Sequence, residues 1–230
     1  TKVNAGVNGF ITNESGEAVE GATITAGTAT TTTDEFGYFK ISNTQFSKTI
    51  GFIQVSKTGY FTGYSSFSPV AGKETFTRLK LIPKTIAGTV DSDAGGTASI
   101  AGGATVTLPA NAVVVAASNS AYSGTVNIAA HWFDPADMTT TSLTMPGNLT
   151  GVDSAGHLNV LQTFGMLAVE LTGSSGELLQ IAAGKKASLH FPLPSSLQST
   201  APVYIPLWYF DETKGVWKQE GHAVKSGNSY

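Results

Sequence analysis

The spacing of apolar residues most constrains the fold of this chain. In residues 1–83, apolar side chains recur at spacings near two, and turn-forming groups such as Gly16, Gly27 and Gly37 interrupt them. Alternation of this kind, with turns every eight to twelve residues, is typical of β-sandwiches. We find no stretch of helical length with a 3.6-residue period. This region is therefore predicted to form about seven short strands.

The rest of the chain shows the same alternation of apolar and polar residues, in longer segments. Alternating segments occupy 105–108 and 124–129, and 158–171 could form one long bent strand or two in sequence. Turn residues at 153–156, 173–176 and 211–215 predict hairpins, because Asp and Ser bond back to the backbone and Gly accepts a positive φ. We expect a second sandwich or an elaborated barrel.

Composition and charge both change after Pro83. A stretch rich in Gly, Ala and Ser covers 87–103, and the balance of seven basic and six acidic residues in 1–83 becomes six and ten in 84–230. We therefore place a domain boundary near Lys84. The predicted fold class is all-β, with two β-sandwich domains in tandem at 1–83 and 84–230.

The sparse charge excludes several kinds of partner. Only 13% of the residues are charged, the net charge is −3 and Arg78 is the single arginine, which argues against nucleic acid. No apolar run has the length of a membrane helix, so membrane attachment is expected only through an anchor outside this chain, as in a lipoprotein. The start at Thr1 and the unmarked end at Tyr230 lead us to expect a removed leader and a longer natural protein.

The first 83 residues resemble a known family. The matching residues are Val7-x-Gly9-x-Ile11, Val19-x-Gly21-Ala22-x-Ile24, Thr33 to Phe39 and Val55 to Tyr60. They are similar to the carboxypeptidase regulatory-like family, a seven-stranded transthyretin-like (prealbumin-like) sandwich found as an accessory module in exported proteins. The most specific part is a structural turn, in which Asp34 caps, Gly37 takes the positive φ and Phe39 returns to the core.

Residues spread over 95–222 resemble a second family. They are Gly95-Gly96, Gly103-x-x-Val106-x-Leu108-Pro109-x-x-Ala112, Thr163 to Leu171, Phe191 to Pro194 and Pro206 to Asp211. This pattern is similar to ZU5-type β domains of bacterial surface proteins and of extracellular animal matrix and membrane proteins. The resemblance implies an extracellular or cell-surface location, in bacteria periplasmic or exposed at the outer membrane.

Three activities of related domains lack their residues here. Transthyretin-like hydroxyisourate hydrolases end in a Tyr-Arg-Gly-Ser signature, where this region ends in Lys80 to Pro83. Relatives of ZU5 cut themselves at His-Phe-Ser, and here His190-Phe191-Pro192 offers no hydroxyl nucleophile. Some related sandwiches join a Lys to an Asn, and Lys2, Lys40 and Asn43 occur without a recognisable motif for that bond.

Other catalytic and metal-binding patterns are also missing from the sequence. It has no cysteine, no zinc spacing among its four histidines, no Gly-x-Ser-x-Gly elbow and no phosphate loop. His131, Asp134 and Asp137 could hold a metal, but a strand end followed by Asp137 capping a short helical turn explains them better. Which of the sixteen acids could pair for hydrolysis stays open. We predict no enzyme, no catalytic or metal residues and no cofactor.

Aromatic residues give the clearest functional hint. Trp132, Trp208 and Trp217 lie in the second region and could stack on a sugar, although buried core positions are the alternative. We predict a non-enzymatic extracellular or cell-surface scaffold or adhesion module that mediates protein interaction or spacing. A carbohydrate-binding module is the alternative. The partner is an unidentified protein or glycan at the cell surface.

Overall fold

The computed structural model describes residues 2–230 of the chain. Strands make up 52% of it and helix 3%, which confirms the all-β prediction. Internal contacts divide the chain into two compact units that interleave in sequence. Unit 1 contains residues 2–83, 137–163 and 204–223, and unit 2 contains 84–136, 164–203 and 224–230.

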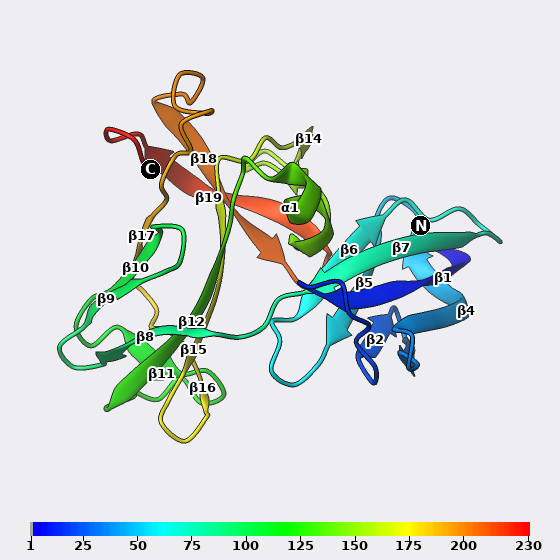
Figure 1. Cartoon of the computed structure of the whole chain (residues 1–230), viewed down its shortest axis with the longest axis horizontal. Coiled ribbons are helices and arrows are strands. Elements are labelled where there is room, and N and C mark those ends of the chain that lie inside the picture. The colour runs from blue at the N-terminus through cyan, green and yellow to red at the C-terminus, as the bar shows by residue number, and fades with distance from the viewer. Residues whose placement is uncertain (1) are drawn as a thin grey trace. The chain divides into compact units, whose positions relative to one another are not determined.

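Unit 1 begins with the expected seven-stranded sandwich, coloured blue to cyan in Figure 1. One sheet has the order β4-β1-β7 and the other the order β3-β2-β5-β6. The long strand β1 pairs antiparallel with β4 and parallel with β7. The strand bounds are β1 (Lys2–Asn13), β2 (Thr23–Ala26), β3 (Ala29–Thr32), β4 (Tyr38–Ser47), β5 (Gly51–Ser56), β6 (Gly63–Phe67) and β7 (Glu74–Leu81).

Alternate residues of these strands build the core of the sandwich. Ile11, Ile24, Phe39, Ile53 and Leu81 come from five different strands, and each is at most 1% exposed. Their neighbours in sequence point away from the core, as the period of two requires. Burial of these side chains from both sheets is what holds the two layers together.

A tight turn before β4 returns the chain to this core. The carboxylate of Asp34 accepts hydrogen bonds from the backbone N–H groups of Phe36, at 3.0 Å, and Tyr38, at 2.8 Å. Gly37 has a φ of 73°, and a Cβ there would collide with the carbonyl oxygen of Ile11. Phe39 follows in the core. The turn therefore needs both the short acceptor side chain and a glycine.

Unit 1 also contains a helix and a third, small sheet from later in the sequence. The sheet has the order β14-β13-β19-β18. Their bounds are α1 (Met138–Thr144), β13 (Thr150–Val152), β14 (Leu158–Val160), β18 (Tyr204–Asp211) and β19 (Val216–Val224). Asp137 caps α1 by accepting from the N–H of Thr140, as predicted.

These later segments contact the outer face of β5 and β6. Gly63 faces the core side chains Leu79 and Leu81, so its neighbour Tyr64 points outward. The ring centroids of Tyr64 and Phe210 are 5.0 Å apart. The backbone carbonyl oxygen of Tyr64 accepts a hydrogen bond from the N–H of Gly147. Segments that the sequence analysis placed in the 84–230 domain thus make their contacts with the first sandwich. Assignment of the two regions to named families stays a prediction.

Unit 2 has a core of its own between two sheets, of orders β11-β16-β15-β12-β8 and β17-β10-β9. Val106, Val126 and Ile128 are at most 1% exposed within it. The run at 158–171 forms two strands, β14 and β15, that belong to different sheets. The bounds in unit 2 are β8 (Ile86–Asp91), β9 (Gly96–Ser99), β10 (Thr105–Leu108), β11 (Val113–Val115), β12 (Thr125–Phe133), β15 (Met166–Thr172), β16 (Leu178–Ile181) and β17 (Ser188–His190).

The turn before β4 gives a test of the fold. We expect Gly37→Ala to lower the free energy of unfolding by about 2 kcal/mol or more, because positive φ is strained for alanine and the Cβ meets a backbone oxygen. Gly16→Ala is the matched control, since Gly16 has a φ of 85° with no atom within 4 Å of its Cβ position. Urea unfolding measures both. Equal losses in the two variants would contradict the role of the collision.

Candidate functional site

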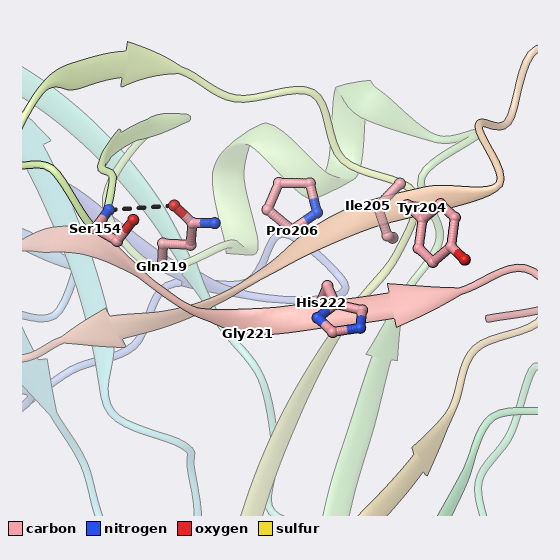
Figure 2. A pocket seen from close by; sticks show the side chains of 7 residues that line it. All are labelled: Ser154, Tyr204, Ile205, Pro206, Gln219, Gly221 and His222. Carbon is pink, nitrogen blue, oxygen red and sulfur yellow. Dashed lines mark hydrogen bonds between the residues drawn. The ribbon is translucent and has the colours of Figure 1, made fainter.

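An open groove of about 560 Å³ lies on the small sheet of unit 1 (Figure 2). Strands β18 and β19 form its floor, and the turn between β13 and β14 forms one wall. Ser154 and Gln219 lie at one end and Tyr204 at the other, with Pro206 between them (Figure 2). The lining residues are Ser154, Tyr204, Ile205, Pro206, Gln219, Gly221 and His222.

The wall is held in place by the turn at 153–156. The Asp153 carboxylate accepts hydrogen bonds from the N–H groups of His157, at 2.8 Å, and Ala155, at 3.0 Å. The bond from His157, above all, lowers the pKa of Asp153, so the carboxylate stays ionised to lower pH and goes on accepting both hydrogen bonds. The N–H of Ser154 then donates to the side-chain oxygen of Gln219 on β19 at 3.2 Å. This bond ties the wall to the floor.

Two rings lie near the other end of the groove. Tyr204 on β18 is 65% exposed, and its ring centroid is 6.2 Å from that of His222 on β19, with the planes tilted by 57°. Gly221 has a φ of 112° and nothing within 4 Å of its Cβ position, which keeps the floor open beside them. Pro206 sits in β18, an edge strand, which is where a sheet tolerates proline.

The turn between β18 and β19 holds these strands together. The carboxylate of Asp211 accepts from the Thr213 hydroxyl at 2.6 Å and forms an ion pair with Lys218, also at 2.6 Å. The Lys218 ammonium, followed by the Thr213 hydroxyl, lowers the pKa of Asp211 to about 2. The carbonyl oxygen of Gly215, in the same turn, accepts a hydrogen bond from the Ser66 hydroxyl of β6 at 2.7 Å. The groove is therefore anchored to the first sandwich.

The tryptophans named from the sequence lie outside the groove lining. Trp217 is 9% exposed and its ring packs 5.5 Å from Phe210, so its faces are occupied by protein. Trp208 is half-buried beside Gly151, and Trp132, in unit 2, is half-buried against Gly102. The side-chain nitrogens of Trp132 and Trp217 are buried without a hydrogen-bond partner. The hypothesis that these rings stack on a ligand stays a prediction.

The candidate metal ligands of the sequence analysis have structural contacts of their own. Among residues 2–230, no three His, Asp or Glu side chains lie close enough together to hold a metal ion. His131 packs its ring against Phe133 at 4.8 Å, and Asp137 caps α1. The side chain of Asp134 accepts from the N–H of Ala136.

Sequence reasoning missed Tyr204 and His222. The tryptophans and the turn at 211–215 were singled out, but the residues at equal distances from that turn on its two strands were not compared. Tyr204 stands seven residues before Asp211, and His222 stands seven after Gly215. Equal spacing from the turn places the two residues opposite each other on paired strands, and this signal could have found them.

Comparisons with known proteins give partial likenesses. No family model matches the chain. It is 31% identical over 116 residues to Cartilage intermediate layer protein 2 of Homo sapiens and 33% identical over 107 residues to its Mus musculus counterpart. These matches cover 49% and 46% of this chain but only 10% and 9% of the relatives, so the chain spans about a tenth of their length.

Solved structures match more weakly. The Bacillus anthracis TIE protein has 11% sequence identity and a TM-score of 0.30, and the match covers 81% of this chain and 31% of that one. A variant of the shaft pilin SpaA of Lactobacillus rhamnosus GG has 12% identity and a TM-score of 0.23, with 82% of each chain covered. No helix within residues 2–230 combines the length and apolarity needed to cross a membrane.

Asp211 gives a pH-dependent test of the anchored hairpin. Its pKa in the folded state, about 2, lies below the usual value, so its contribution to stability is present above about pH 4 and is lost as the pH falls toward 2. We expect Asp211→Asn to cost about 1 to 2 kcal/mol of unfolding free energy at pH 7, after screening at the partly exposed Lys218 is allowed for.

Urea unfolding at pH 7 and at pH 2.5 measures this difference, which should shrink at the lower pH. Glu220→Gln, at an exposed position of the same strand β19, serves as the control and should change stability little at either pH. A difference between Asp211→Asn and the wild type that is equally large at both pH values would contradict the ionic role of Asp211.

Proposed function

We propose that the chain is a non-enzymatic binding and adhesion module that works outside the cell or at its surface. The open groove lined by Tyr204, His222, Ser154 and Gln219 carries this proposal. It presents an exposed ring and several hydrogen-bonding groups on a firmly anchored pair of strands. An open surface of this kind suits contact with part of a large ligand, whereas small-molecule sites enclose most of their ligand.

The composition and the resemblances support this location. The chain contains 30 Thr and 22 Ser with only 13% charged residues, so its polar surface is largely hydroxyl and amide, which is common in exported β-rich modules. We propose that 1–83 is a carboxypeptidase regulatory-like domain and that 84–230 contains a ZU5-like domain. We also propose that any membrane attachment uses an anchor outside this chain, with a periplasmic or exposed position if the source is bacterial.

A glycan is the second candidate ligand, and the two ends of the groove favour it. The exposed Tyr204 ring could lie against the apolar face of a sugar. The Ser154 hydroxyl and the Gln219 amide, at the other end, could pair with sugar hydroxyls. Rings and amides in one open groove offer both kinds of contact that a sugar chain makes.

Screening the whole chain against a glycan array and a displayed random-peptide library tests the proposal. We expect a ligand whose affinity falls about three- to tenfold in Tyr204→Ala, because a ring contact is worth about 0.5 to 1.5 kcal/mol. The control Tyr209→Ala removes an aromatic ring that is 44% exposed on the same strand but outside the groove, and it should retain binding.

The outcomes separate the alternatives. A glycan ligand supports the carbohydrate reading, and a peptide ligand supports protein adhesion. Mass spectrometry of the recovered ligand should find it unaltered, since a changed mass would indicate an enzyme. Binding that is equal in the wild type and in Tyr204→Ala, or no binding to either collection, would contradict a binding role for the groove.

A further inference from the structure

A cluster of aromatic rings lies on the outer face of the other sheet of the sandwich. We call Phe10, Tyr38, Phe76 and Arg78, on the three strands β1, β4 and β7, the aromatic platform. The Phe10 ring lies 5.3 Å from that of Tyr38 and 6.2 Å from that of Phe76. Phe10 is 36% exposed and Phe76 is 52% exposed. Adjacent exposed rings of this kind on a soluble protein mark an interaction surface.

Strand register explains how the platform is assembled. Phe10 stands opposite Tyr38 on β4 and opposite Arg78 on β7. Because Val7, Gly9 and Ile11 of β1 are buried, the alternating residue Phe10 must point to the outer side. Gly9 lies against the backbone of Thr77, where a side chain would not fit, so β1 and β7 approach each other closely beneath the rings. The platform is thus built on rigid strands.

The two outer faces of the sandwich differ within unit 1. On β5 and β6, the outward residues Phe52 and Tyr64 are covered by the Gly215 turn and by Phe210. On β1 and β7, the outward rings Phe10 and Phe76 are 36% and 52% exposed, although α1 contacts β7. The hairpin therefore buries one aromatic face of the sandwich, whereas the rings of the other face stay partly exposed.

The charges around the platform favour an acidic partner. Lys40, Arg78 and Lys80 lie on this face of β4 and β7 with the carboxylate of Glu74. Lys80 donates to the carbonyl oxygen of Glu14 at 3.2 Å and interacts with the nearby carboxylate of Asp137, so Arg78 is the cation that matters for a partner. Both oxygens of the Glu74 carboxylate already have partners, since one pairs with Lys40 at 2.8 Å and the other accepts a hydrogen bond from the Asn8 amide at 3.0 Å. The Arg78 guanidinium lies over the Phe76 ring at 5.3 Å, and within residues 2–230 no carboxylate forms an ion pair with it. Its fork of donors is free to receive a carboxylate.

The geometry of the rings favours a protein segment over a sugar chain. The planes of Phe10 and Tyr38 are tilted by 54°, and those of Phe10 and Phe76 by 66°, so no two rings form one flat stacking surface. Arg78 covers one face of Phe76 as well. Side chains of a peptide can insert between tilted rings, and aromatic and arginine residues are the usual hot spots of protein interfaces.

We propose that the aromatic platform is a second docking surface, which binds a protein segment carrying an Asp or Glu beside apolar side chains. The carboxylate pairs with the guanidinium of Arg78, and the apolar side chains pack on Phe10 and Phe76. This surface is separate from the groove of Tyr204 and His222, and the two can be tested independently.

A peptide selection tests the platform on the full chain. A random displayed-peptide library is panned against the Tyr204→Ala, His222→Ala variant, so that ligands of the groove are not selected. We expect enriched peptides with Asp or Glu next to apolar residues. Their affinity should fall about tenfold or more in Phe76→Ala and in Arg78→Glu, with partial retention in Arg78→Lys, which keeps the charge but loses the planar fork.

Controls separate a lost contact from a lost fold. Phe76 and Arg78 are exposed, so their variants should keep the thermal midpoint of the parent, and Tyr209→Ala should keep its affinity. Three results would each overturn the proposal. The first is that acidic peptides are not enriched. The second is that the chain binds a polyuronate through Arg78 and binds no peptide. The third is that the chain self-associates with rising concentration and Phe76→Ala abolishes this.

Discussion

The position of the later segments of unit 1 depends on the packing of the Phe210 ring on Tyr64. This contact joins a hairpin from the last part of the sequence to a strand of the first sandwich. Burial in this contact, together with the Glu212 carboxylate that accepts from the Tyr64 hydroxyl, raises the pKa of Tyr64. Two hydrogen bonds, from Ser66 to Gly215 and from Gly147 to Tyr64, fix the same junction. Apolar burial and fixed polar contacts therefore reinforce each other there.

This junction also decides which aromatic faces of the first sandwich are covered. The hairpin that covers Tyr64 is the one whose far end carries Tyr204 and His222, so anchoring one end supports the groove at the other. On the outer face of β1 and β7, Phe10 and Phe76 stay partly exposed beside Arg78. One long-range contact thus separates a covered aromatic face of the first sandwich from an exposed one.

The sequence predicted strand content well because its information is local. Alternation placed Ile11, Ile24 and Phe39 in the core, and Asp-Gly turn chemistry located the hairpins at 153–156 and 211–215. The destination of those hairpins was not predictable in the same way. Nothing in the residues around Phe210 specifies Tyr64 as their neighbour, because pairing between distant segments depends on tertiary packing. For the same reason, the buried position of Trp217 could not be separated from an exposed one by pattern alone.

Hydroxyl-radical footprinting of the whole chain, read by mass spectrometry, tests the central claim most directly. After correction for the intrinsic reactivity of each residue type, Tyr64 and Trp217 should be oxidised much more slowly than Tyr204 and Phe76. Rapid oxidation of Tyr64, at a rate like that of Tyr204, would contradict the account, because the hairpin would then not cover the outer face of the first sandwich.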